Sequence, residues 1–530
     1  MPPAPLDDSR FPGLRRRGFL AAAGGAAGLG ALALAGCGGP GGSGAAAGGD
    51  GKPRRGGTLR AAFAGGGASE TLDPHRTNLF ADAARAKALF DKLADYGNDL
   101  SAQPRLAASW EPNDGLDRWR VKLRKATFHD GGPVTAADVL YSYRRIADPK
   151  EGFRAKASLE PIDLKASRAV DRRTVEFVLK RPTAEFPNVL AAFGAYIVPE
   201  GATEFDRKPV GSGPFRFVSF TPGRSTVVER YDDHWDGAPH LDRLEFLVAN
   251  EESARVNSLL GGQVEYAHEL TPTTARAHEG KGQIEIIRLR NSAMQAFAMK
   301  TDRAPFDDKR VREAFFLIAD RKELVEGALS GAGEIGNDLF GKGYEYYADG
   351  LPQRTQDLDK ARHLLKKAGA DGLKVTLDTS DVASGFTEAA SIFRDQAAEA
   401  GVHVKVRTGS KDTYWADTLD SGTLASYRSG AMPIESHLSQ RLLTDSTTNA
   451  THWHHKDFDA LYQQAQSTKD KKERAAVYGR MQRRLYAEGG FLVWGFADWI
   501  LGTAKNVRGV THEAPANTLD WARFDKVWLA

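Results

Sequence analysis

"LKVTLDT" (residues 373–379), "FTEAASIFRDQAAEAG" (386–401) and "VHVKV" (402–406) follow one another along the chain and decide its fold class. The first and last pieces alternate apolar and polar residues, which is the pattern of a half-buried strand. The middle piece carries its apolar residues on one face of a helix, and Gly401 ends it. A strand, a helix and a strand of these lengths predict two parallel strands joined by a right-handed crossover. We therefore expect an α/β protein with several lobes.

Capped helices are predicted on the N-terminal side of this unit. Asp308, Asp320 and Asp357 each precede apolar residues at helical spacing, and each can accept hydrogen bonds from the first turn. The second of these helices should cover residues 321–329, and the third should end before Gly369. Two further helices are expected, one after Thr135 and one over about residues 474–487.

The N-terminus predicts an export signal over residues 1–37. A patch of three arginines at 15–17 precedes a short apolar stretch rich in alanine and glycine, and the order resembles a twin-arginine signal. Leu34-Ala35-Gly36-Cys37 resembles the bacterial lipobox, in which the signal is cut before the cysteine and lipid is attached to its sulfur. Cys37 is the only cysteine, so an internal disulfide is excluded. The alternative is a spare cysteine in an ordinary signal.

The composition of the rest of the chain limits its domain organisation and its possible partners. Residues 38–56 are rich in glycine and should form a flexible linker. The following residues, about 470 of them, are enough for two or three lobes. Lys and Arg number 72 against 69 Asp and Glu, and this balance gives no indication of nucleic-acid binding. No later apolar segment is long enough to span a bilayer.

Signatures of catalysis and of cofactor binding are missing from the sequence. There is no G-x-S-x-G, S-x-x-K or H-E-x-x-H motif. "GNDLFGKG" (336–343) has the spacing of a phosphate loop, but Gly343 stands where a Ser or Thr would hold magnesium, which favours a turn. His452, His454 and His455 favour a polar loop over a metal site. We expect no catalytic residue, metal or cofactor, although paired carboxylates of a hydrolase stay open until distances are known.

Several aromatic residues lie in segments of mixed polarity. They could form the wall of a ligand cleft or pack in the core, and the sequence leaves both open for Trp415, Tyr427, Trp494, Phe496 and Trp499.

A series of longer motifs carries a resemblance to a known family. Thr71-Leu72-Asp73-Pro74 follows "GGTLRAAF" (56–63), and the later motifs come in the order "PRLAASWEPNDG" (104–115), "RWRVKLRKATFHDGGPVTAADVLYSYRRIADP" (118–149), "PVGSGPFRF" (209–217), "ERYDDHWDGAPHLDRLEF" (229–246) and "PFDDKRVREAFFLIADRKELV" (305–325). From about Gly56 to its end the chain resembles extracellular solute-binding protein family 5, the oligopeptide-, dipeptide- and nickel-binding components of ABC importers.

The resemblance implies an α/β periplasmic-binding-protein type II fold of cluster C. Such a fold has two lobes that close by a hinge and an accessory domain inserted in the first lobe. The implied boundaries are residues 57–79, 209–290 and 500–530 for lobe I, 80–208 for the inserted domain and 291–499 for lobe II.

The resemblance also implies ligand-binding residues. Asn78 and Phe80 occupy the loop that meets the ligand backbone in peptide-binding members. Trp415 matches a tryptophan of the second lobe, "YRSG" contains Tyr427 and the matching Arg428, and Trp494 and Phe496 match late aromatics. For each, the alternative is a packing or surface role.

One departure from the family concerns the ligand's amine. Peptide-binding members place an aspartate shortly after the matching arginine, but residues 421–444 contain none, and Glu435 is the only acid there. Because a buried ammonium needs an anionic partner, either Glu435 replaces the aspartate or the ligand lacks a free amine.

The function that the resemblance implies is a binding one. We expect an extracytoplasmic receptor, anchored to the membrane through lipid on Cys37, that captures a short peptide or similar polar solute. The receptor would be a monomer and would deliver the solute to an ABC permease with its ATPase subunits. We expect it to bind no nucleic acid. A nickel-chelate or sugar-derivative receptor, a secreted hydrolase and a signalling receptor without its own permease are the alternatives.

Overall fold

The computed structural model describes residues 52–76, 79–411, 413–510 and 522–530. The predicted signal, its Cys37, most of the predicted linker and Asn78 lie outside these residues. Contacts group Lys52–Ala530 into a single unit. None of the helices in the described ranges combines the length and the apolar composition that crossing a bilayer requires.

The predicted strand–helix–strand unit is confirmed. β14 (Lys374–Thr379) and β15 (His403–Thr408) pair in parallel from Lys374 opposite His403 to Thr379 opposite Thr408. α9 (Phe386–Glu399) connects them and buries the apolar face that includes Ala389, Phe393 and Ala397. The spacing of the apolar residues therefore determines both elements and their pairing.

The predicted helix caps are confirmed as well. Asp308, Asp320 and Asp357 accept hydrogen bonds from backbone N–H groups of the first turn at 2.8, 2.9 and 2.9 Å. At Thr135 the capping is reciprocal, since the Thr135 N–H donates to the Asp138 carboxylate at 2.8 Å and the Asp138 N–H donates to the Thr135 hydroxyl at 3.5 Å. The late helix begins at Lys471 with Asp470 as its cap, three residues before the predicted start.

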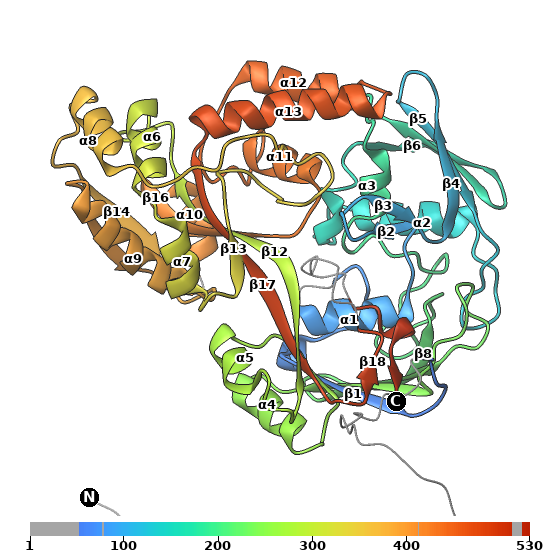
Figure 1. Ribbon diagram of the computed structural model, residues 1–530. Coiled ribbons are helices and arrows are strands. Elements are labelled where there is room, and N and C mark those ends of the chain that lie inside the picture. The colour runs from blue at the N-terminus through green and yellow to red at the C-terminus, as the bar shows by residue number, and fades with distance from the viewer. Residues whose placement is uncertain (1–51, 77–78, 412, 511–521) are drawn as a thin grey trace, which may run out of the picture. The chain divides into compact units, whose positions relative to one another are not determined.

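Most strands belong to one sheet of eleven strands that passes through both lobes. Its order is β15-β14-β16-β12-β17-β11-β1-β10-β9-β8, and β13 pairs with β17 beside this path. The two longest strands, β12 (Glu285–Met299) and β17 (Phe491–Thr503), run antiparallel to one another. Figure 1 shows them side by side, from the level of α4 and α5 to the helices of the second lobe.

The first lobe lies around one half of this sheet. It contains residues Glu285 to Leu289 of β12 and residues Trp499 to Thr503 of β17. Its other elements are β1 (Thr58–Phe63), α1 (Phe80–Leu89), β8 (Phe215–Thr221), β9 (Ser225–Arg230), β10 (Arg243–Val248), α4 (Glu252–Leu260), β11 (Tyr266–Ala267), α5 (Pro272–His278), β18 (Val507–Arg508) and β19 (Trp528–Leu529).

In the second lobe, helices cover both faces of the other half of the sheet. One apolar cluster lies under α6, α7, α8 and α9, and another lies under α11, α12 and α13. The remaining elements of this lobe are α6 (Lys309–Ile318), α7 (Arg321–Ala328), β13 (Gly333–Ile335), α8 (Leu358–Lys367), α10 (Tyr414–Asp420), β16 (Leu424–Gly430), α11 (Ile434–Leu442), α12 (Lys456–Gln466) and α13 (Lys471–Glu488).

The inserted domain has a sheet and a core of its own. Its four-stranded sheet has the order β4-β5-β7-β6, and a two-stranded sheet pairs β2 with β3. The elements are β2 (Ala94–Tyr96), β3 (Ala102–Pro104), β4 (Ala107–Pro112), β5 (Arg118–Leu123), α2 (Ala136–Ala147), β6 (Ile162–Asp171), β7 (Thr174–Leu179) and α3 (Phe186–Leu190).

The core clusters bear on one domain boundary. Ala81, Ala84 and Ala88 of α1 are buried in the same cluster as Leu59 and Phe63 of β1. Since α1 packs on the sheet of the first lobe, we propose that the inserted domain begins after α1 and not at Phe80. The other boundaries stay predictions.

The two long strands change register between the lobes. Leu289 lies opposite Trp499, and the next pair is Ala293 opposite Ala497. Residues 290–292 of β12 therefore face Asp498 alone, which makes a bulge that bends the pair. Asn291 there has a φ of 55°. Burial raises the pKa of Asp498 to about 6. We propose that this bulge is the hinge between the lobes.

Candidate functional site

Three aromatic rings gather on the first-lobe side of the hinge. Phe80 begins α1, His268 follows β11, and Trp499 lies in β17. The ring centroids lie 4.6 Å apart for Phe80 and Trp499, 5.1 Å for Phe80 and His268, and 5.4 Å for His268 and Trp499. We call these three residues the ring cluster.

Arg428 of the second lobe reaches this cluster across the hinge. Its Cζ atom lies 5.6 Å from the Trp499 ring centroid, in a cation–π contact. Arg428 lies in β16 opposite Gln295 of β12, on the second-lobe side of the bulge. Burial lowers the pKa of Arg428, and the negative charge of Glu269 opposes that change. The structure therefore brings the predicted residues Phe80 and Arg428 into one site.

Glu269 carries the opposing charge on the first lobe. Burial raises the pKa of its carboxyl group, and the Arg428 charge opposes that change. Neither His268 nor Glu269 was predicted from the sequence. The available signal was weak, namely two polar residues that directly follow the short β11 strand.

Neither charged group of this pair is neutralised at short range. Both side chains are half-buried. Among the residues that the structure describes, neither the Arg428 guanidinium nor the Glu269 carboxylate forms a hydrogen bond or a salt bridge within 4.0 Å. Because an unpaired buried charge is costly, the site is suited to bind a group that supplies the missing partner.

Trp415 and Tyr427 lie together in the second lobe. The two rings stand edge to face with centroids 6.3 Å apart. Trp415 is 40% exposed, whereas Tyr427 is 5% exposed and packs on Phe491. Because neighbouring residues of a strand point to opposite faces, Tyr427 and Arg428 lie on different sides of β16. Trp415 is therefore the member of this pair with an exposed aromatic surface.

Trp494 and Phe496 pack in the core of the second lobe. Each is 1% exposed. The register of β12 and β17 shifts at Trp494, since Gln295 lies opposite Gly495 and Ala296 lies opposite Val493. This bulge places Trp494 in the cluster under α7 and α9, and Phe496 in the cluster on the other face. Core packing, which the sequence had left open, describes both side chains, and neither offers an exposed surface to a ligand.

Glu435 lies in the first turn of α11 and has partners already. Its carboxylate accepts hydrogen bonds from the Tyr462 hydroxyl, from Ser436 at 3.1 Å and from Gln466 at 3.5 Å. Burial raises its pKa, and the charge of Glu185 in the inserted domain raises it further. Its described hydrogen-bond partners include neither Arg428 nor a member of the ring cluster.

A buried ion pair near Glu435 joins the inserted domain to the second lobe. Arg474 Nε of α13 lies 2.6 Å from Glu185 Oε1, and the side chains are 10% and 9% exposed. The Tyr346 hydroxyl donates to Glu185 at 2.9 Å, and the Ala184 N–H donates to the Gln466 carbonyl at 2.8 Å. We call Glu185, Arg474, Tyr346 and Gln466 the clasp.

The histidines considered for a metal site have another arrangement. His452 Nδ1 lies 2.9 Å from the Asp302 carboxylate. In the described ranges, no group of three or more His, Cys, Asp or Glu side chains has the geometry to hold a metal ion.

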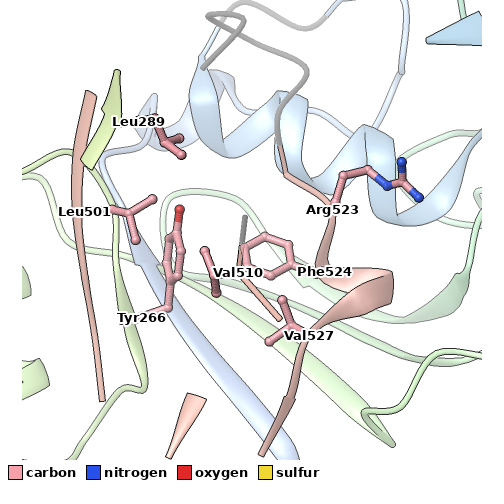
Figure 2. Close-up of a pocket in the computed structure, with 7 residues that line it drawn as sticks. All are labelled: Tyr266, Leu289, Leu501, Val510, Arg523, Phe524 and Val527. Carbon is pink, nitrogen blue, oxygen red and sulfur yellow. The ribbon is translucent and has the colours of Figure 1, made fainter. Parts of the chain in front are cut away.

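Two cavities are lined by residues outside the ring cluster. Tyr266 and Phe524 face each other across the first, with ring centroids 5.3 Å apart (Figure 2). Its volume of about 10 Å³ leaves room for one water at most, so it is a packing gap in the first lobe. The second has a volume of about 180 Å³ and is lined by Ser69, Thr71, His75, Arg76, Glu151, Gly152 and Phe153.

Comparison with known proteins agrees with this architecture. The model of the bacterial extracellular solute-binding proteins, family 5, matches residues 101–451. The chain is 25% identical over 470 residues to the glutathione-binding protein GsiB of Pectobacterium atrosepticum. The aligned region covers 85% of this chain and 91% of GsiB.

Two solved structures have similar folds. The binding protein AgaA from A. tumefaciens R10, in complex with agropinic acid, is 26% identical with a TM-score of 0.74, covering 89% of this chain and 99% of its own. The periplasmic binding protein DppA from Helicobacter pylori, in complex with the peptide STSA, is 22% identical with a TM-score of 0.74, covering 90% and 99%. The chain therefore belongs to family 5 of the bacterial extracellular solute-binding proteins, the substrate-binding components of ABC importers.

Proposed function

We propose that this chain captures a short peptide or similar polar solute with a carboxylate, closes its lobes over it and delivers it to an ABC permease with its ATPase subunits. Arg428 carries the proposal, because it reaches from the second lobe to Trp499 of the first and has no anionic partner within salt-bridge distance among the described residues. A carboxylate would form charge-assisted hydrogen bonds with this guanidinium. Capture and release need no catalysis, and we propose none.

Closure follows from contacts with both lobes. A solute shifts the equilibrium toward the closed form only if it binds that form better. A carboxylate held by Arg428 of the second lobe and an apolar part packed on Phe80 of the first would touch elements on both sides of the hinge. The bulge at residues 290–292 offers the place where the long strands bend.

The relatives support an acidic solute. GsiB binds glutathione, AgaA is in complex with agropinic acid and DppA with a tetrapeptide, and all three ligands contain carboxyl groups. The absence of an aspartate between residues 421 and 444 keeps a dedicated non-peptide acid as the second candidate.

Native mass spectrometry of residues 38–530, purified without added ligand, tests the proposal. We expect bound masses that differ by amino-acid residues, whereas a single mass of other composition would identify the non-peptide acid. A protein that is empty as purified and stays empty after incubation with a peptide digest would contradict capture of peptides.

We also propose that lipid on Cys37 anchors the chain, as a monomer, to the extracytoplasmic face of the membrane. A diacylated cysteine gains about 0.8 kcal/mol per buried CH₂ group, which is enough to hold a large domain at a bilayer. Cys37→Ser should move the protein from the membrane fraction to the soluble fraction on immunoblots. Ala35→Ser, two residues away, is the control and should leave it in the membrane fraction. A Cys37→Ser protein that stays with the membrane would show that lipid on Cys37 is not the anchor.

A further inference from the structure

Glu269 of the first lobe is the acidic residue whose charge acts on Arg428 of the second lobe. Its charge acts on the Arg428 guanidinium, and Arg428 is the strongest charge that acts on Glu269. Its neighbour His268 stacks with Phe80 and Trp499, and Trp499 carries the Arg428 contact. Two unlike charges from different lobes therefore border one aromatic cluster without pairing directly.

The backbone at Glu269 is held firmly in place. Buried Arg255 of α4 donates from Nε to the His268 carbonyl at 2.8 Å and from Nη2 to the Glu269 carbonyl at 2.9 Å. The flanking N–H groups of His268 and Leu270 donate to Ala62 at 2.9 Å and to Ile500 at 2.8 Å. Glu269 itself has a φ of 54°, a left-handed conformation that few residues with a side chain adopt. Its backbone position is therefore fixed before a solute arrives.

We propose that Glu269 is the specificity-determining residue that holds the cationic group of a zwitterionic solute, while Arg428 holds its carboxylate. This inference rests on the proposed function and names its substrate class. A solute with both charges supplies the partner that each side chain lacks among the residues that the structure describes. It also interacts with both lobes at once, and that double contact favours the closed form.

Glu435 is the less suitable partner for an amine. Tyr462, Ser436 and Gln466 already donate hydrogen bonds to its carboxylate, and Glu185 of the clasp is the nearby charge. A solute ammonium at Glu435 would have to displace these donors. At Glu269 it would meet a carboxylate that has no hydrogen-bond donor among the described residues.

The experiment measures capture from a defined peptide mixture. The mature full-length protein in detergent is incubated with a casein digest, with the same digest after N-acetylation and with the same digest after C-terminal amidation. Bound peptides are quantified by mass spectrometry for the wild type, Glu269→Gln, Glu269→Asp, Glu435→Gln and Glu251→Gln. Glu251 is exposed, precedes α4 and serves as the matched control for loss of one negative charge.

We expect the wild type to prefer free amines over acetylated peptides by about 30-fold or more, since loss of one partner of a buried charge pair has that effect. Glu269→Gln should remove the preference, Glu269→Asp should keep part of it, and the Glu435 and Glu251 variants should keep all of it. Unchanged melting temperatures confirm that the variants are folded.

The contrary outcomes are distinct. A preference that survives in Glu269→Gln and disappears in Glu435→Gln would overturn the inference and assign the amine to Glu435. A wild type that captures peptides with and without a free amine equally would overturn it and leave the proposed function standing. Capture of no peptide from any digest would contradict peptide capture itself.

Discussion

Arg428→Met should weaken solute binding by about 100-fold or more. Removing one partner of a buried, hydrogen-bonded charge pair costs about 2–5 kcal/mol, and here it would leave the solute carboxylate between the lobes without a cation. In the wild type, the Arg428 Cζ atom lies 5.6 Å from the Trp499 ring centroid. Methionine keeps an unbranched apolar side chain that can still lie against this ring. Isothermal titration calorimetry with the solute identified by native mass spectrometry measures the effect.

The controls for Arg428 separate charge from geometry. Arg428→Lys keeps the charge but lacks the planar fork that binds a carboxylate through two parallel hydrogen bonds, so an intermediate loss is expected. Arg394→Met removes a half-exposed arginine of α9 whose ion-pair partner in the described part of the chain is its neighbour Asp395, at 2.8 Å, and this variant should bind like the wild type. Wild-type affinity in Arg428→Met would place the solute carboxylate elsewhere.

Arg474→Met should have the largest effect on stability, because it leaves Glu185 of the clasp without its cation. Breaking a buried pair by removing one member costs about 3–5 kcal/mol. The loss applies at neutral pH, where Glu185 is charged in the unfolded chain. The midpoint of urea unfolding, followed by tryptophan fluorescence, measures it.

The pH dependence of this variant has a definite sign. Burial already raises the folded-state pKa of Glu185 above its ordinary value of 4.5. Without Arg474 that pKa rises further, so the folded state binds a proton more readily than the unfolded state. Stability is then greatest below pH 4.5 and is lost as the pH rises through the folded-state pKa. The deficit of Arg474→Met should therefore shrink on acidification from pH 7.5 toward pH 5.

A double variant tests the assignment to the clasp. Glu185→Gln with Arg474→Met removes both charges, and it should recover much of the stability that Arg474→Met loses, with no comparable pH dependence. A deficit in Arg474→Met that stays constant between pH 5 and 7.5 would show that Glu185 is not the group responsible.

The sequence predicted those elements of the fold that depend on neighbouring residues alone. The alternation of β14 and β15 and the apolar face of α9 are set by neighbouring residues, and so are the caps Asp308, Asp320 and Asp357. The start of α13 was placed too late because the exposed turn after Asp470 carries no apolar signal.

The site was only partly predictable because its residues meet through distant strand pairing. The resemblance indicated Phe80, Trp415 and Arg428, but Glu269 comes near Arg428 only because β12 and β17 pair across the hinge. The burial of Trp494 and Phe496 depends on a bulge in β17. No residue type in "LVWGFAD" predicts this bulge. Glu435 borders the clasp because a separate domain packs there, and sequence spacing does not encode that contact.

The strand order of the large sheet also constrains how the protein is made. In the first lobe, β1 lies between β10 and β11, and β11 pairs with β17, so the earliest strand is enclosed by strands that the ribosome produces much later. The second lobe draws its part of the sheet from one continuous stretch, residues 293–497. Domains fold as units during synthesis, so the second lobe can be complete while β11 still lacks its neighbour, residues 502–503 of β17. The first lobe contains the earliest strand of the large sheet and is the last to close.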